Sequence, residues 1–157
     1  MRAWHFTAKP WTLRDGGTFE AGETITHEGE IEICRSGLHA SQRAIDALNY
    51  APGAWVYRVE CRGIEGRHDD KLVCRERTAL WAYDATDVLR RFARLCALDV
   101  IDVWDAPSVV VRYLRTGDES IRNAAARSAS DDAYYAASDD ACCAASAAWH
   151  AANEPSR

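Results

Sequence analysis

The sequence predicts an α+β fold: a twisted, mostly antiparallel β-sheet flanked by helices, followed by an alanine-rich C-terminal helix. Two observations predict it. Up to about Asp84, apolar and polar side chains alternate in short runs, which is the period of half-buried strands. Beyond Asp84, apolar residues recur at the helical period. In a chain of 157 residues we expect a core domain at 1–115 and a helical extension with a short polar tail at 116–157.

The first 33 residues are predicted to form short antiparallel strands. Side chains alternate over residues 3–7, so that one face of the strand is aromatic and apolar. Asp15, Gly16 and Gly17 then form a strong turn signal, because glycine tolerates a positive φ. These features indicate a meander that begins the sheet.

Residues 34–60 contain three predicted elements in a compact run. A tight turn and a short apolar segment come first, and a helix is predicted to begin at Ser41, whose hydroxyl is a good N-cap. Pro52 and Gly53 end that helix. Residues 55–61 then alternate with the period of a strand.

Two further strands are predicted at 71–74 and 78–81, after a polar loop at 63–70. Asp84 is expected to cap a helix, since its carboxylate suits the positive end of the helix dipole. The apolar positions of this helix are expected to form a buried stripe of Val88, Leu89, Phe92, Leu95 and Cys96.

The last third of the chain is predicted to be helical. Pro107 suits the first turn of one helix, Gly117 ends it, and Asp118 caps the next. Alanine, the best helix former, makes up 14 of the 35 residues from 119 to 153, so a single helix is predicted there. Such a shallow apolar surface could serve to form a homodimer.

Composition excludes several classes of protein. A net charge of −5 argues against direct nucleic-acid binding, which usually needs a clustered basic surface. The six cysteines form no C-x-x-C pair, which favours free thiols in a reducing cytoplasm over disulfides or a metal site. Neither a signal peptide nor a membrane-spanning segment is expected.

Four segments carry a resemblance to a known fold. Residues 4–7 (WHFT), 37–41 (GLHAS), Tyr50 and 57–63 (YRVECRG) together resemble the ADP-ribosyltransferase fold of the diphtheria-toxin and poly-ADP-ribose-polymerase type. The resemblance spans residues 4–74. It implies NAD as cofactor and transfer of ADP-ribose as the activity.

The resemblance also implies roles for five side chains. His5 would hydrogen-bond the nicotinamide ribose, Tyr50 would stack on the nicotinamide ring, and Thr7 would support the loop after the first strand. His39 stands where the family has Tyr, and Asp70 would take the place of the catalytic Glu. A carboxylate suits this chemistry because glycosidic bond cleavage builds an oxocarbenium-like positive charge.

These side chains have plainer alternatives. His5 could be a satisfied core or surface histidine, His39 a local hydrogen-bonder, and Tyr50 a packing residue over a helix end. A solvated surface of mixed charge, and not an anion site, is expected for a set of basic residues and one acidic residue: Arg75, Arg77, Arg90, Arg91 and Arg94 with Glu76. The residues alone leave catalysis undecided.

A second resemblance covers nearly the whole chain. The motifs GLHAS, DALNYAPG, CALDVIDVWDAP and TGDES, with the alanine-rich tail, resemble a family of small phage and prophage proteins. This implies a protein made in the cytoplasm of a bacterial host cell, with a host protein or complex as partner. Two function classes stay open: an ADP-ribosyltransferase-like accessory protein, or a non-catalytic inhibitor of the counter-defence or anti-CRISPR type.

Overall fold

The computed structural model describes residues 1–13 and 16–135, and it confirms the α+β class. The chain divides into two compact units, the first being Met1–Ala85 and the second beginning at Thr86. This division differs from the expected boundary after residue 115. The physical reason is that the helices beyond Thr86 bury side chains in a core of their own.

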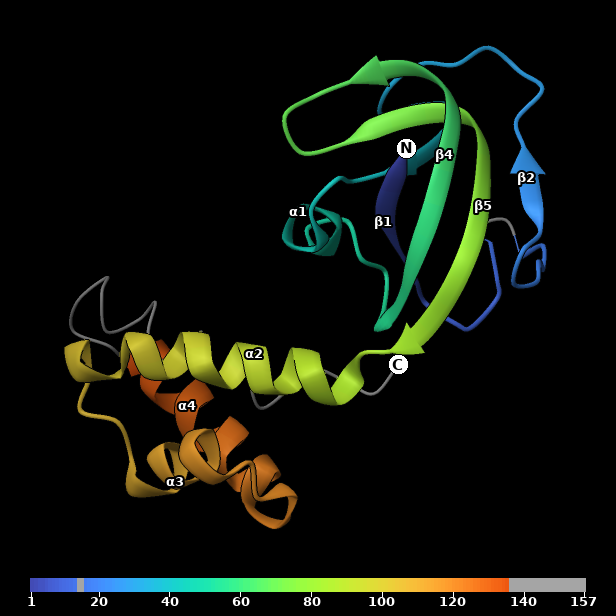
Figure 1. Cartoon of the computed structure of the whole chain (residues 1–157). Helices are drawn as coiled ribbons and strands as arrows, with labels where there is room; N and C mark the ends of the chain where they lie inside the picture. The colour runs from blue at the N-terminus through green and yellow to red at the C-terminus, as the bar shows by residue number, and fades with distance from the viewer. Residues whose placement is uncertain (14–15, 136–157) are drawn as a thin grey trace. The chain divides into compact units, whose positions relative to one another are not determined.

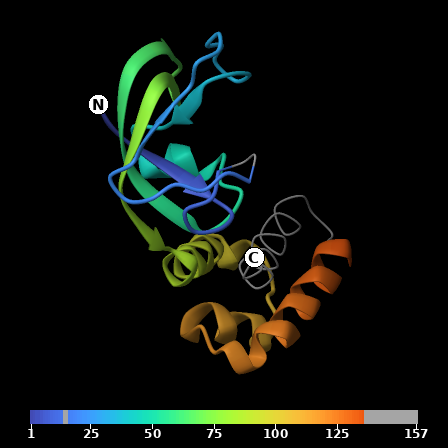
Figure 2. The same cartoon turned by 90° about the vertical axis from the view of Figure 1, so that its right-hand side faces the viewer.

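The first unit is built on one antiparallel sheet (Figure 1). Its strands are β1 (Arg2–Thr7), β2 (Thr24–Thr26), β3 (Leu38–Ala40), β4 (Trp55–Arg67) and β5 (Leu72–Asp84). Their order is β1-β4-β5-β2, and β3 also pairs with β5. The β4–β5 hairpin is long and strongly curved, as Figures 1 and 2 show.

Hydrogen bonds between two main-chain segments close these strands into a ring. Ser41 directly follows β3, which pairs with β5. Its N–H donates to the oxygen of Trp4 in β1 across 2.9 Å, and the Trp4 N–H donates back across 2.7 Å. Since β1 pairs with β4 and β4 with β5, the ring β1-β4-β5-β3 is complete. The prediction that Ser41 caps a helix is therefore wrong, because α1 (Ala44–Leu48) begins three residues later without a side-chain cap.

The hairpin strands are longer than the sequence predicts. The expected loop at 63–70 is largely strand, and the two predicted strands at 71–74 and 78–81 are one continuous β5. Gly63 accounts for the extension, because its φ of +59° bends β4 without ending the pairing, and Ile64 still pairs with Cys74. The hairpin turn is confined to residues 68–71.

Aromatic side chains fill part of the core of this unit. Tyr57 on β4 is fully buried. The rings of Trp11 and Phe19 lie 5.4 and 5.5 Å from its ring, and the Trp11 N–H donates to its hydroxyl. The side chain of Tyr57 thereby attaches the segment before β2, which contains Trp11 and Phe19, to the sheet.

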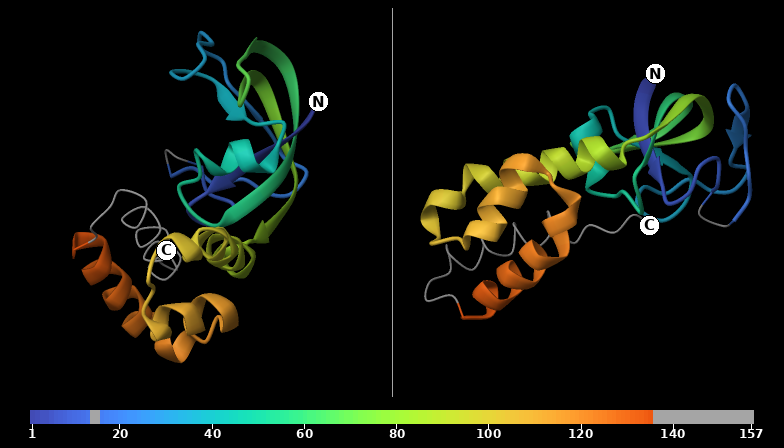
Figure 3. Two further views of the ribbon diagram at one scale, coloured as in Figure 1. Left: turned by 90° about the vertical axis from the view of Figure 1, so that its left-hand side faces the viewer. Right: turned by 90° about the horizontal axis from the view of Figure 1, so that it is seen from below.

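The second unit contains α2 (Thr86–Asp99), α3 (Ser108–Thr116) and α4 (Arg122–Tyr135), seen from two directions in Figure 3. As predicted, Gly117, with φ +68°, ends α3, whereas Pro107 is the N-cap residue just before the first turn and does not lie within it. The core of the second unit is made largely of small side chains: Ala97, Val110, Tyr113, Leu114, Ala125, Ala126 and Ala129. The predicted single helix over 119–153 begins as a 3-10 turn followed by α4, and its part beyond residue 135 lies outside the described residues.

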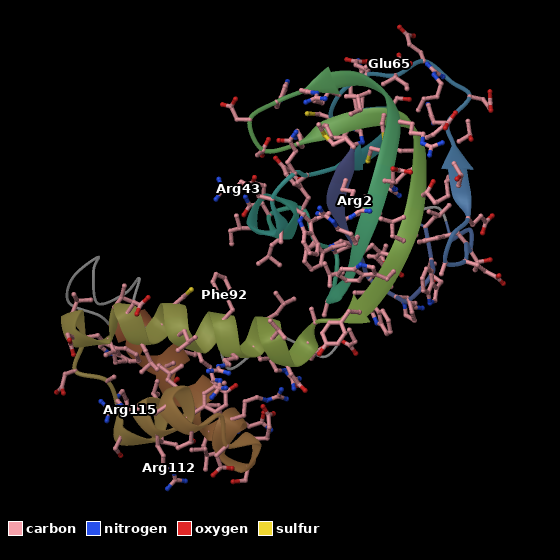
Figure 4. The ribbon with its side chains drawn as sticks, in the orientation of Figure 1. Arg2, Arg43, Glu65, Phe92, Arg112 and Arg115 are labelled. Carbon is pink, nitrogen blue, oxygen red and sulfur yellow. The ribbon has the colours of Figure 1, made fainter. Side chains whose placement is uncertain are left out.

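The predicted buried stripe on α2 is wrong. Val88, Phe92 and Leu95 are 56%, 44% and 51% exposed, and Phe92 points away from α3 and α4 in Figure 4. The helix packs instead through Ala97, with Ala93 beside it, because alanines allow close approach to α3.

Candidate functional site

The five side chains that the sequence singles out all lie in the first unit. His5 and Thr7 are on β1, and His39 is on β3. Tyr50 follows α1, and Asp70 lies in the turn between β4 and β5. They fall into an outer group around Tyr50 and Asp70 and an inner group around His5.

The outer group is a hydrogen-bonded trio on the surface. The Tyr50 hydroxyl donates to an oxygen of the Asp70 carboxylate. The Lys71 ammonium donates to the same hydroxyl across 3.3 Å and lies 4.5 Å from the centre of the Tyr50 ring. The hydrogen bond from Tyr50 holds the pKa of Asp70 below its usual range. Asp70 therefore carries an ionised, oriented carboxylate at neutral pH.

Lys71 links this trio to the loop before β3. Hydrogen bonds with the Cys34 thiol and then with the Tyr50 hydroxyl raise the pKa of Lys71. Cys34 is exposed and has a φ of +71°, which is uncommon outside glycine. The Lys71 ammonium thus bonds both to Tyr50 of the trio and to Cys34 in the loop that leads to His39.

His39 uses both ring nitrogens locally. Its Nε2 accepts a hydrogen bond from the Cys34 N–H at 2.9 Å, so Nδ1, 3.1 Å from the Gly37 oxygen, carries the proton. Burial lowers the pKa of His39, the bond to Gly37 opposes this, and the charges of Lys71 and Arg77 lower it further. The imidazole is therefore neutral and fixes its own loop.

The inner group is formed by His5 and Arg77. Arg77 on β5 is only 6% exposed, and its Nη1 donates to the main-chain oxygen of His39 across 2.7 Å. Burial, and then the charges of Arg77 and His39, hold the pKa of His5 well below its usual value. The expectation that Arg77 lies on a solvated surface is thus wrong.

Thr7 has a local role. Its side chain is 5% exposed, and its hydroxyl donates to the main-chain oxygen of Lys9 across 2.6 Å. The hydroxyl therefore stabilises the loop that follows β1.

Sequence reasoning placed Arg77 on the surface and gave Lys71 no role. A signal for Arg77 exists, because it lies two residues before the buried Ala79 and so shares its face of the strand. That signal appears only once 71–74 and 78–81 are joined into one strand. Lys71 carries no comparable signal, since its role depends on a tyrosine and a cysteine from other segments.

Three further observations concern metal binding, membrane-spanning helices and cavities. Within residues 1–13 and 16–135, no group of three or more His, Cys, Asp or Glu side chains is placed to hold a metal ion. No helix in the same ranges is long and apolar enough to cross a membrane. In the second unit, a shallow hollow of about 470 Å³ is lined by residues 101–106, Val111 and Arg115. None of the candidate residues lines it.

The site and the ring of strands define a class of protein: a small antiparallel sheet domain with a buried arginine, a partly buried histidine and a surface carboxylate. The chain belongs to the family described as "Domain of unknown function (DUF7666)", whose model matches residues 1–91. All candidate residues lie within that match. The searches of curated proteins and of solved structures found no match.

Proposed function

We propose that the first unit binds NAD and transfers ADP-ribose to a protein of a bacterial host cell, in whose cytoplasm a phage or prophage would produce it. The observation that carries the proposal is the Asp70 carboxylate, held by the Tyr50 hydroxyl and kept ionised. A fixed negative charge is what stabilises the positive charge that develops on the ribose ring.

The reaction needs few groups. The bond between C1′ of the ribose and the nicotinamide nitrogen breaks, nicotinamide leaves with the electron pair, and a nucleophile of the acceptor bonds to C1′ and loses its proton. Asp70 would face the developing charge, and Tyr50 would hold both Asp70 and the nicotinamide ring. His39, whose ring nitrogens bind its own loop, would keep Cys34 and Lys71 in position.

The test uses the full chain, NAD with a labelled adenine moiety and a bacterial lysate as acceptor. We expect labelled host proteins with the unaltered chain, and loss of labelling in Asp70→Asn. Asp69→Asn, a change in the neighbouring carboxylate, is the matched control and should retain labelling. Absence of both labelling and nicotinamide release with the unaltered chain would refute the transferase.

A second function, a non-catalytic inhibitor that binds a host macromolecule, is favoured by an aromatic surface. Trp81 and Tyr83 on β5 are 45% and 55% exposed. The Trp81 ring lies 5.8 Å from that of Trp4, over which the Arg58 guanidinium lies at 4.6 Å. Tryptophan, tyrosine and arginine are the side chains most enriched at binding hot spots.

The two functions respond oppositely to mutation. Phage growth on a defended bacterial strain that expresses the protein provides the readout. Under the inhibitor hypothesis, Trp81→Ala abolishes the effect and the double variant of Tyr50→Phe and Asp70→Asn retains it. The transferase hypothesis predicts loss in the double variant.

A further inference from the structure

We propose that Arg77 and His5 form an oxyanion site beside the core of the first unit, which takes the pyrophosphate of a dinucleotide. The identity of the ligand as NAD rests on the proposed function. The chemistry of the site, a phosphate-type oxyanion bound by a guanidinium and an imidazole, is argued from the side chains themselves.

The first argument is the unpaired charge of Arg77. This side chain is 6% exposed, and its one hydrogen bond among the described residues joins Nη1 to the His39 oxygen. No carboxylate in residues 1–13 or 16–135 lies within ion-pair distance of it. A buried charge is costly unless it is paired. A bound anion supplies the missing partner.

The second argument is that the unused donor atoms of Arg77 and His5 keep some accessible surface. Within the described part of the chain, no fully inaccessible side-chain nitrogen or oxygen lacks a hydrogen-bond partner. Arg77 makes a single hydrogen bond, so its other side-chain nitrogens are not completely inaccessible. The same holds for His5, whose partly buried ring makes no hydrogen bond to another described residue. Both side chains are thus available to a ligand.

The third argument is the sign of the surrounding charges. The charge of Arg77 lowers the pKa of both His5 and His39, and the charge of Lys71 lowers that of His39 as well. Burial lowers the pKa of Arg77, and the only groups that oppose this are the weakly acidic thiols of Cys61 and Cys74, neither of which is a carboxylate. Two cations, Lys71 at the surface and the buried Arg77, therefore lie near His39, and their field favours the entry of an anion.

Arginine suits this role better than lysine. Its planar guanidinium binds two phosphate oxygens at once, whereas an ammonium acts as a point charge. One edge of the Arg77 guanidinium is held by the His39 oxygen, which orients the rest of the fork. His5 would donate its ring N–H to a third oxygen.

The test measures binding of inorganic pyrophosphate and of NAD to the full chain by calorimetry at constant ionic strength. We expect pyrophosphate to bind the unaltered chain, and Arg77→Lys and Arg77→Gln to lose affinity about tenfold or more, as loss of a charged hydrogen bond predicts. Arg75→Gln is the matched control. Arg75 lies on the same strand but is paired with Glu65 at 2.7 Å, so its loss should change affinity less than twofold.

A second readout covers the case in which the Arg77 variants do not fold. The ring nitrogens of His5 should shift in the nitrogen-15 spectrum of the unaltered chain when pyrophosphate is added, and His5→Gln should bind it more weakly. The absence of calorimetric heat and of any His5 shift would overturn the inference. So would equal affinity in a folded Arg77→Gln variant.

The outcomes separate this inference from the proposed function. Binding of pyrophosphate that depends on Arg77, without binding of NAD, would support the oxyanion site and refute the transferase. Binding of NAD with equal affinity to the unaltered chain and to Arg77→Gln would refute the site and leave the transferase standing.

Discussion

The Tyr50 hydroxyl donates a hydrogen bond to the carboxylate of Asp70, 20 residues further along the chain. The bond joins the segment after α1 to the turn of the β4–β5 hairpin. Lys71 donates to the same hydroxyl, so one tyrosine oxygen holds two side chains of that turn. The acidic group of the proposed site is therefore positioned from outside its own hairpin.

Removing this hydroxyl should raise the pKa of Asp70. In Tyr50→Phe the carboxylate loses the bond that is the largest cause of its lowered pKa. We expect the pKa to return toward the ordinary range, with the fold unchanged, in a carbon-13 titration of the Asp70 carboxyl. Tyr83→Phe, an exposed tyrosine elsewhere, is the control. An unchanged Asp70 pKa in Tyr50→Phe would show that the bond is absent in solution.

Stability should decrease as the pH falls below about 6.5, the ordinary pKa of an unfolded histidine. His5 and His39 have lowered pKa values in the folded state, so the unfolded chain binds their protons first. Above that pH the two histidines do not lower the free energy of unfolding. As the pH falls from there toward their folded-state pKa values, that free energy decreases. Each proton adds a slope of at most about 1.4 kcal/mol per pH unit.

The His5→Gln variant tests this slope by urea unfolding at several pH values. The variant takes up one proton fewer on unfolding. The slope of its unfolding free energy against pH should therefore be smaller by up to about 1.4 kcal/mol per pH unit. The unaltered chain, measured at the same pH values, is the reference. A His5→Gln slope equal to that of the unaltered chain would contradict the burial of His5.

Gly37→Ala should destabilise the first unit. Gly37 has a φ of +105°, and a Cβ atom would lie 2.5 Å from Cγ2 of Val73. Backbone strain and overpacking together predict a loss of at least about 2 kcal/mol in the free energy of unfolding. Gly22→Ala separates the two effects, because Gly22 has a φ of +84° but open space around it. Equal losses in both variants would show that the contact with Val73 costs nothing.

Tyr57→Phe should cost about 1–2 kcal/mol in the free energy of unfolding, because the Trp11 N–H loses its acceptor while the buried ring remains. Chemical denaturation measures the loss, and hydrogen exchange at the Trp11 amide should become faster. Tyr83→Phe, at an exposed position, should change stability by less than about 0.5 kcal/mol. Unaltered exchange at Trp11 would argue that its amide has another acceptor.

Local patterns predict much of the fold because their causes are local. The alternation over residues 3–7 and 55–61 reappears in β1 and β4, since the period of a strand is set by its own backbone. Pro107 and Gly117 mark the ends of α3 for similarly local reasons. The stripe on α2 was wrong because a periodic pattern shows that a helix has an apolar face, whereas packing decides which face is covered.

The sequence by itself determined the α+β class, β1, the first half of β4 and the end of α3, all of which follow from neighbouring residues. Only the tertiary structure decided the closure of the ring through Trp4 and Ser41, and the burial of Arg77. The physical reason is sequence distance. A hydrogen bond such as that from Arg77 to His39 joins segments whose approach depends on the pairing of whole strands, and no periodicity within either segment encodes that approach.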